Sequence, residues 1–273
     1  MMTIENKMAM LVENGYLLLE NVIPENLLAD CRNIFSEKLV KLGASQEHSF
    51  SDQYRTLTKN IHPYEINKLL MREIVGSGLA LRLFHSTEIL NCFIHIIGPD
   101  LAYQTNSELP VNVKGETNDS LVKKFHQEFW TGPGHRTFTF WTPLILSKGA
   151  GTLELIRKSH TWGHVPHQNR EPKFIPSDAE LQIIDCKEGD ALIFHSLMLH
   201  RTVPNKIDCP RLAYATQVRN MNDPDSNFDR FNSWEVFNLS PATRILKECG
   251  NVHLSPFRTY GSTRAPIKPT ITV

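Results

Sequence analysis

Cysteine is scarce in this sequence, and its positions fit neither of the residue's common structural uses. The chain of 273 residues has five cysteines, widely separated and without a CxxC pair. An odd number of dispersed cysteines argues against a disulfide framework and against a structural zinc site. We therefore expect reduced thiols and a cytoplasmic protein.

The sequence also lacks net charge and long apolar runs. Its 29 Lys and Arg residues balance 29 Asp and Glu residues. Without a basic excess, no global field favours nucleic acid or an anionic membrane. No stretch has the length and apolar character of a membrane span, and the first residues do not resemble a signal peptide. We expect no nucleic-acid or membrane partner, and a small molecule instead.

Internal repeats, low-complexity tracts and heptad runs are absent as well. A hydrophobic content of 41% over 273 residues suits one sizeable core. We predict a single domain over residues 1–273. It would consist of a largely helical cap (1–100), a β-rich core (101–220) and a C-terminal helix and loop extension (221–273).

The cap shows apolar residues at the three- and four-residue spacing that is typical of amphipathic helices. Asn14-Gly15 is suited to end the first helix, and Pro24 to begin the second. The segment from Ala44 to Pro63 is polar and irregular, so we expect a loop. The predicted helices cover Thr3 to Glu13, Pro24 to Gly43, Pro63 to Leu83 and Ser86 to Ile97, with a strand starting at Tyr16.

After Pro99 the pattern changes to short apolar segments separated by turn residues. Gly132-Pro133-Gly134 and Gly149-Ala150-Gly151 are typical turn sequences. Several short strands at this spacing favour a mainly β fold with flanking helices, a sandwich or barrel such as a jelly roll. Predicted strands begin at Leu101, Leu121, Arg136, Thr152, Leu181, Asp190 and Arg211.

A candidate metal site lies in the segment LVKKFHQEFW, from Leu121 to Trp130. If this segment is a strand, His126 and Glu128 lie on one face, because strand side chains alternate. An imidazole nitrogen and a carboxylate oxygen can then bind one ion, but a third protein ligand is needed.

Two histidines in DALIFHSLMLHRTVPN are candidates for that third ligand. His200 lies where a strand meets a turn, a position at which a ligand stays accessible to substrate. His195 is five residues earlier and would point to the opposite face of a straight strand. We therefore prefer His200.

Together these segments resemble the phytanoyl-CoA dioxygenase family of iron- and 2-oxoglutarate-dependent oxygenases. GYLLLENVIP is similar to the family's early strand followed by a Pro-started helix. HQE stands where the family usually has His-x-Asp, and FWTPLILSKGAGTLELIRKSH is similar to its tryptophan-led strand and closing Ser-His. The resemblance runs from about Gly15 to Asn220 and implies a double-stranded β-helix, the cupin-like form of the jelly roll.

The resemblance also implies the roles of individual residues. His126, Glu128 and His200 would bind Fe(II), leaving positions for 2-oxoglutarate and dioxygen. Arg211 matches the family's arginine for the distal carboxylate of 2-oxoglutarate. The remaining co-substrate positions are Thr202, for the same carboxylate, and Trp141 and Gln104, for the pocket wall.

The sequence departs from the family pattern at sites that carry charge. Glu128 has one methylene more than the usual aspartate, and Arg157-Lys158 replaces the usual Pro-Gly before Ser-His. The local charge is therefore more positive than is usual in the family and would suit an anionic substrate. Arg136 and Arg157 are the candidate substrate-binding residues.

The function that this resemblance implies is hydroxylation of a small organic molecule, with release of succinate and CO2. Desaturation, ring formation and epimerisation stay open, because the substrate decides among them. Two other functions also stay open: a cupin-like metal enzyme that uses no 2-oxoglutarate, and a small-molecule binder without catalysis.

Overall fold

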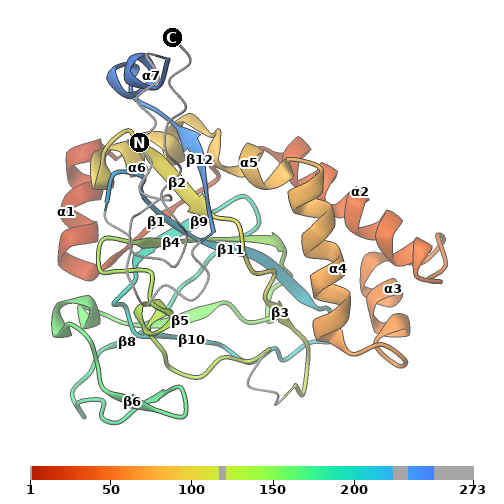
Figure 1. The fold of residues 1–273 in the computed structure, drawn as a ribbon. Coiled ribbons are helices and arrows are strands. Elements are labelled where there is room, and N and C mark those ends of the chain that lie inside the picture. The colour runs from red at the N-terminus through yellow and green to blue at the C-terminus, as the bar shows by residue number, and fades with distance from the viewer. Residues whose placement is uncertain (1, 117–120, 224–232, 249–273) are drawn as a thin grey trace, which may run out of the picture.

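Two antiparallel sheets face each other, and helices cover the outer side of the larger one (Figure 1). The computed structural model describes residues 2–116, 121–223 and 233–248. The larger sheet has the strand order β1-β9-β4-β11-β2-β12, with β3 also paired to β11. The smaller sheet has the order β10-β5-β8, and β6 and β7 form a separate hairpin. This arrangement confirms the predicted jelly-roll fold with flanking helices.

The strands are short, as the spacing of turn residues predicts. Those of the larger sheet are β1 (Tyr16–Leu19), β2 (Leu101–Gln104), β3 (Val111–Asn112), β4 (Phe138–Ile145), β9 (Ala191–His195), β11 (Arg211–Asn220) and β12 (Trp234–Asn238). The others are β5 (Leu153–Ile156), β6 (His167–Gln168), β7 (Glu171–Pro172), β8 (Leu181–Ile183) and β10 (His200–Thr202).

The helices begin and end near the predicted residues, with one addition. The Thr3 hydroxyl accepts a hydrogen bond from the Asn6 amide at the start of the first helix, and Gly15 ends it in a left-handed conformation. A helix over Phe50–Leu57 replaces the predicted loop. The helices are α1 (Ile4–Asn14), α2 (Glu25–Lys41), α3 (Phe50–Leu57), α4 (Pro63–Gly76), α5 (Leu79–Phe84), α6 (Thr87–Ile97) and α7 (Pro241–Glu248).

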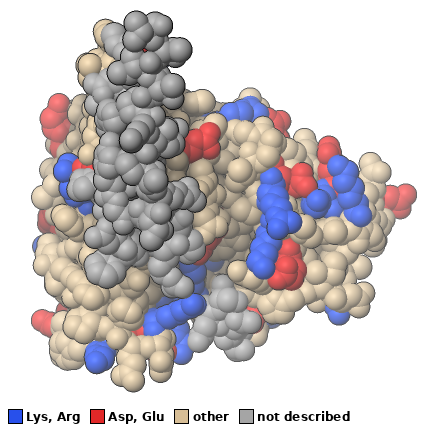
Figure 2. Space-filling model, viewed as in Figure 1, with Lys and Arg blue, Asp and Glu red and all other residues tan. Residues whose placement is uncertain are grey.

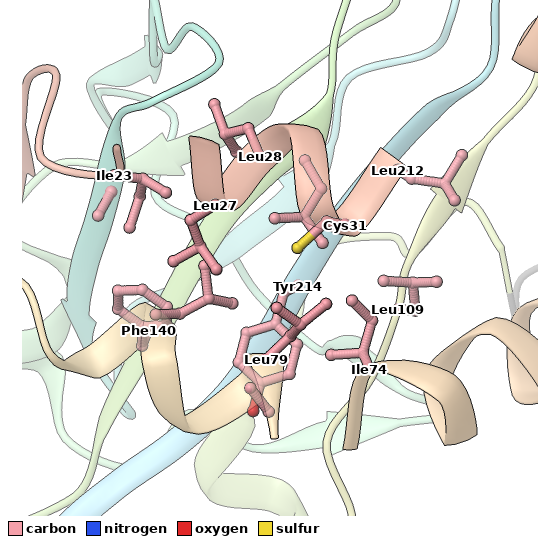
Figure 3. Packing of buried hydrophobic residues seen from close by; sticks show 14 of the residues in the cluster. Ile23, Leu27, Leu28, Cys31, Ile74, Leu79, Leu109, Phe140, Leu212 and Tyr214 are labelled. Atoms are coloured by element: carbon pink, nitrogen blue, oxygen red, sulfur yellow. The ribbon is translucent and has the colours of Figure 1, made fainter. Parts of the chain in front are cut away.

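Strand alternation divides the apolar residues between two cores. On β11, Leu212, Tyr214 and Val218 pack against the helices, whereas Ala213 faces the space between the sheets. The outer core is large, and Figure 3 shows Leu27 of α2 and other helical side chains close to the strand residues. Both faces of the larger sheet are therefore buried, which holds its strands in one register.

The inner core lies between the sheets and is smaller. Trp141 of β4, Leu155 of β5 and Phe194 of β9 belong to it. Because Ala213 and Ala215 are small, β11 leaves space on this face, and polar side chains of the same strand reach into the interior. The site described below lies on this side of the larger sheet.

Two further predictions of local structure are wrong. Leu121–Trp130 is not a strand: its one β-bridge joins His126 and His200, and the 3-10 helix η1 (Glu128–Thr131) follows. In the predicted helix and loop extension, β12 is a strand that pairs with β2. Residues 249–273 of that extension lie outside the described residues.

Three further features of the described residues concern their cysteines, helices and charges. Their four cysteines are free thiols. None of their helices has the length and apolar character required to cross a bilayer. Figure 2 shows Lys and Arg side chains interspersed with Asp and Glu over the visible face.

Candidate active site

His126 and His200 are held side by side by the backbone. The amide of each donates to the carbonyl of the other, at 3.0 and 3.1 Å, although the residues are far apart in sequence. Their rings lie 4.1 Å apart between centroids. His200 is the first residue of β10, so this bridge extends the backbone hydrogen bonding of the smaller sheet to the His126 segment.

Glu128 completes a group of three side chains that could hold a metal ion. Its Oε1 atom lies 3.4 Å from Nε2 of His126 and 3.4 Å from Nε2 of His200. One ligand atom from each residue lies within 4.8 Å of the other two, as a shared ion requires. Two imidazoles and a carboxylate are the donor set of the facial triad that binds non-haem Fe(II) and leaves open coordination positions. The donor set therefore fits iron.

The outer ring nitrogens fix the orientation of both histidines. Nδ1 of His126 lies 2.7 Å from the Lys124 carbonyl, and Nδ1 of His200 lies 3.1 Å from the Met198 carbonyl. A carbonyl can only accept, so each Nδ1 carries the proton, and Nε2 is directed toward Glu128. Backbone partners of this kind commonly orient metal-binding histidines.

The ionisation of the site also suits metal binding. Burial and the neighbouring His126 lower the pKa of His200, against the opposing effect of Glu128, so its ring is neutral at pH 7. Burial would raise the pKa of Glu128, but the two neighbouring histidines and the charge of Lys123 hold it well below its usual range. A neutral imidazole and an ionised carboxylate are the forms that bind a metal.

Gln127, between the two ligands in sequence, is a positioning residue that the sequence reasoning missed. Its side-chain nitrogen donates to the carbonyls of Gly163 and Leu197, and its oxygen accepts from the Trp130 indole and the Val165 amide. The side chain is only 1% exposed. These bonds anchor the ligand segment, which lacks the support of a full strand ladder.

Arg211 lies at the start of β11 and is fully buried, with none of its three guanidinium nitrogens bonded to a described residue. Its guanidinium carbon lies 5.5 Å from the ring centroid of Trp141, whose indole nitrogen also lacks a partner. Burial lowers the pKa of Arg211 to about 10, so it remains charged at pH 7. A buried, unpaired guanidinium is costly unless an anion binds it.

Thr202 and Gln104 occupy positions compatible with their predicted roles. His200 and Thr202 are buried on one face of β10, whereas Arg201 between them is exposed and pairs with Glu154. Gln104, at the end of β2, is 5% exposed, and its side-chain nitrogen has no partner among the described residues.

A cavity of about 400 Å³ opens beside the metal-binding group. Gln104, His126 and Glu128 line it, together with Thr139 and Gln217, which the sequence reasoning did not select. Arg211, Thr202 and Trp141 are not part of this lining. The side-chain oxygen of Gln217 is buried and has no partner in the described part of the chain, so the wall offers polar groups to a bound molecule.

The two arginines predicted to bind substrate lie elsewhere. Arg136 forms a 2.9 Å ion pair with Asp223. Arg157 pairs with Glu180 at 2.5 Å and donates to the Asn14 side chain at 2.7 Å. Neither arginine lines the cavity, and their role in substrate binding remains a prediction.

His195 is separate from the metal-binding group, which agrees with the preference for His200. Its Nδ1 atom accepts from the Leu197 amide at 3.1 Å, and its ring contacts Phe138 edge-on and lies 6.1 Å from that of His160. Burial, followed by the charge of His160, lowers the pKa of His195 from 6.5 to about 4.

This shift predicts an acid-sensitive contribution to stability. The folded protein keeps His195 neutral, so the contribution is fully present above pH 6.5 and is lost as pH falls toward 4, where only the unfolded chain binds the proton. When the pH is lowered from 7 to 4.5, the unfolding free energy of His195→Asn should fall by about 2 kcal/mol less than that of the wild type. Urea denaturation at both pH values measures this, and equal losses would contradict the assignment.

A β sandwich with two histidines and a carboxylate at one end defines a class, the cupin-like metal-dependent oxygenases. The chain belongs to the phytanoyl-CoA dioxygenase (PhyH) family, whose model matches residues 11–213. This confirms the resemblance read from the sequence and makes the protein an oxygenase.

A curated relative agrees with that assignment. The chain is 26% identical over 264 residues to the 1-deoxypentalenic acid 11-beta-hydroxylase of Streptomyces exfoliatus, which covers 89% of this chain and 87% of the relative. A second protein of the same name, from Streptomyces arenae, is 25% identical over 242 residues and covers 81% of each chain.

Solved structures share the fold. The non-heme monooxygenase ThoJ superposes with a TM-score of 0.58 at 18% identity, over 87% of this chain and 84% of ThoJ. The epimerase SnoN, solved with Fe3+, alpha-ketoglutarate and nogalamycin RO, gives a TM-score of 0.53 at 15% identity, over 97% of this chain and 93% of SnoN.

Proposed function

We propose that this protein is an Fe(II)- and 2-oxoglutarate-dependent oxygenase that hydroxylates a small organic molecule. The observation that carries the proposal is the presence of two features between the two sheets. One is the His126, Glu128 and His200 group, and the other is the buried guanidinium of Arg211. A metal and a carboxylate-bearing co-substrate would satisfy both.

In this proposal, the chain's own residues bind and orient the reactants. His126, Glu128 and His200 hold the iron, with the Nδ1 hydrogen bonds fixing both rings. Arg211 pairs with the distal carboxylate of 2-oxoglutarate, assisted by the hydroxyl of Thr202. The iron, when bound, supplies the oxidising chemistry that inserts oxygen into a C–H bond while 2-oxoglutarate becomes succinate and CO2.

Trp141 and Gln104 form part of the co-substrate's surroundings in this proposal. The face of the indole lies beside Arg211 and excludes water from the guanidinium. The unpartnered amide nitrogen of Gln104 can donate to an oxygen of a ligand in the cavity. Dry surroundings strengthen the ion pair and restrict side reactions.

An anaerobic titration tests the proposal directly. Addition of 2-oxoglutarate to the protein with Fe(II) should produce a metal-to-ligand charge-transfer band in the visible spectrum. Admission of oxygen should then release succinate. Metal binding without the band would favour a Lewis-acid metal enzyme of the same fold, and failure to bind Fe(II) would favour a binder without catalysis.

A further inference from the structure

A short hairpin lies at the mouth of the cavity. Strands β6 and β7 pair across a two-residue turn, Asn169-Arg170. Both turn residues line the same cavity as His126 and Glu128. The hairpin extends beyond the smaller sheet, at the lower left of Figure 1.

The turn holds Arg170 in an unusual backbone conformation. Asn169 and Arg170 have φ angles of 52° and 62°. Two-residue hairpins of type I′ need positive φ at both positions, and the second is usually glycine. For a residue with a Cβ the left-handed region is disfavoured, so arginine makes this turn less stable than glycine would. Strain of this kind is often found at ligand sites.

The hairpin is attached to the segment that carries the metal ligand Glu128. The ring of His167 in β6 stacks on Trp130 of η1, with centroids 4.1 Å apart and planes 15° from parallel. Glu171 in β7 forms a 2.5 Å ion pair with Lys124. These contacts fix the hairpin relative to the metal group, so Arg170 has a defined place at the cavity mouth.

Arg170 is also the cation at the cavity mouth that has no ion-pair partner among the described residues. Lys123 pairs with Glu108, and Lys124 pairs with Glu171. Arg170 is exposed and has no ion pair with a described residue, and Lys123 is close enough to repel it. An anion bound in the cavity would satisfy this charge.

We propose that Arg170 recognises a carboxylate of the substrate, so that the enzyme acts on a small organic acid. This inference rests on the proposed function, because it assigns the substrate of the same site. A guanidinium pairs with a carboxylate through two parallel hydrogen bonds. One unmatched cation suits a monoanion better than a phosphate, which gathers several cations. The indole of Trp130 and the methyl of Ala215 provide apolar surface for the rest of the molecule.

Binding of two isosteric probes tests this proposal without turnover. The probes are 2-naphthoate and its neutral amide, 2-naphthamide, titrated by calorimetry against the protein with saturating 2-oxoglutarate and Zn²⁺. Wild type should prefer the acid. Arg170→Gly should weaken 2-naphthoate about fivefold and leave 2-naphthamide unchanged, as expected for a partly exposed ion pair. The preference should shrink at high salt, because ions screen exposed charges.

Three further variants keep the result interpretable. Arg170→Lys keeps the charge and should retain most of the preference. Arg55→Gln removes an exposed arginine on α3 that does not line the cavity and should change nothing. Arg170→Gly should fold normally, since glycine suits the turn.

A separate titration distinguishes the two anion sites. In this titration 2-naphthoate is first bound to the protein without metal or 2-oxoglutarate, and 2-oxoglutarate is then added. Naphthoate bound at Arg211 would be displaced by the added 2-oxoglutarate and would not bind to Arg211→Ala. Naphthoate bound at Arg170 would persist in both cases. Equal affinity of wild type and Arg170→Gly for 2-naphthoate, or no saturable binding of it, would overturn the Arg170 proposal. It would leave the iron and 2-oxoglutarate assignment intact.

Discussion

His200→Ala is expected to abolish Fe(II) binding and turnover together. The variant removes one of three ligands from a group whose other members, His126 and Glu128, lie next to it. Since loss of an outer-sphere partner alone lowers metal affinity about 10- to 100-fold, loss of a ligand should lower it by at least about 100-fold. Equilibrium dialysis with Fe(II) under nitrogen measures the change. Affinity within threefold of the wild type would exclude His200 as a ligand.

Glu128→Asp is the matched variant for the carboxylate. It keeps the charge but withdraws the oxygen by about 1.5 Å, and in the structure the longer side chain places Oε1 equally far from both imidazoles. We therefore expect weaker Fe(II) binding in Glu128→Asp, although aspartate is usual in the family. Unchanged affinity would show that the His126 segment adapts to either length.

Arg211→Ala is expected to lower the affinity for 2-oxoglutarate by about 100-fold, equivalent to about 3 kcal/mol, because the lost partner is a buried, charged donor. Fe(II) affinity should stay within about threefold, since Arg211 is not a member of the metal-binding group. The charge-transfer band, titrated with 2-oxoglutarate, reports the first quantity, and dialysis reports the second. A variant that binds 2-oxoglutarate as tightly as the wild type would refute the assignment.

A second variant at this position, Arg211→Met, tests how Arg211 affects the stability of the ligand-free protein. In the absence of ligand, the three guanidinium nitrogens of Arg211 have no partner among the described residues. Replacement by methionine removes a buried, unpaired charge, so Arg211→Met should melt at or above the temperature of the ligand-free wild type. Added 2-oxoglutarate should stabilise the wild type and not the variant. Arg211→Met would then separate binding from folding, which Arg211→Ala does less cleanly because it leaves a cavity.

The metal-binding group was predictable from residue types and order, but its local structure was not. His126 and Glu128 were placed together because strand side chains alternate, yet they come together through one bridge to His200 and a turn of 3-10 helix. The segment LVKKFHQEFW was expected to be a strand, but the bonds made by Gln127 to Gly163, Leu197 and Val165 hold it in another conformation. Those partners are distant in sequence, so no local pattern reveals them.

The helix at Phe50–Leu57 and the strand β12 show the same limit. Phe50–Leu57 is polar, but Tyr54 and Leu57 are buried on one face, and α3 packs against α2. β12 completes the edge of the larger sheet beside β2. In both cases tertiary packing decides a structure for which the local preference is weak.

The charged residues that line the cavity could not be identified from their order in the sequence. Arg136 and Arg157 were selected because local positive charge would suit an anionic substrate, but they pair with Asp223 and Glu180 instead of lining the cavity. Arg170 was not selected, since a charged residue in a polar loop has no distinctive pattern. Its place beside the metal group depends on the stacking of His167 on Trp130, a contact between two separate loops.

The sequence by itself determined the mainly β core with its helical cap, and through its resemblance to the family it predicted the donor set and the cation for the co-substrate. These follow from residue types, turn signals and the order of motifs, which are local or one-dimensional features. Only the tertiary structure decided how Glu128 reaches both histidines, why Arg211 is left without a partner, and which cation lies at the cavity mouth. Each of these depends on which side chains from distant parts of the sequence come together in the fold, and the burial of Arg211 sets the cost of its unmet charge.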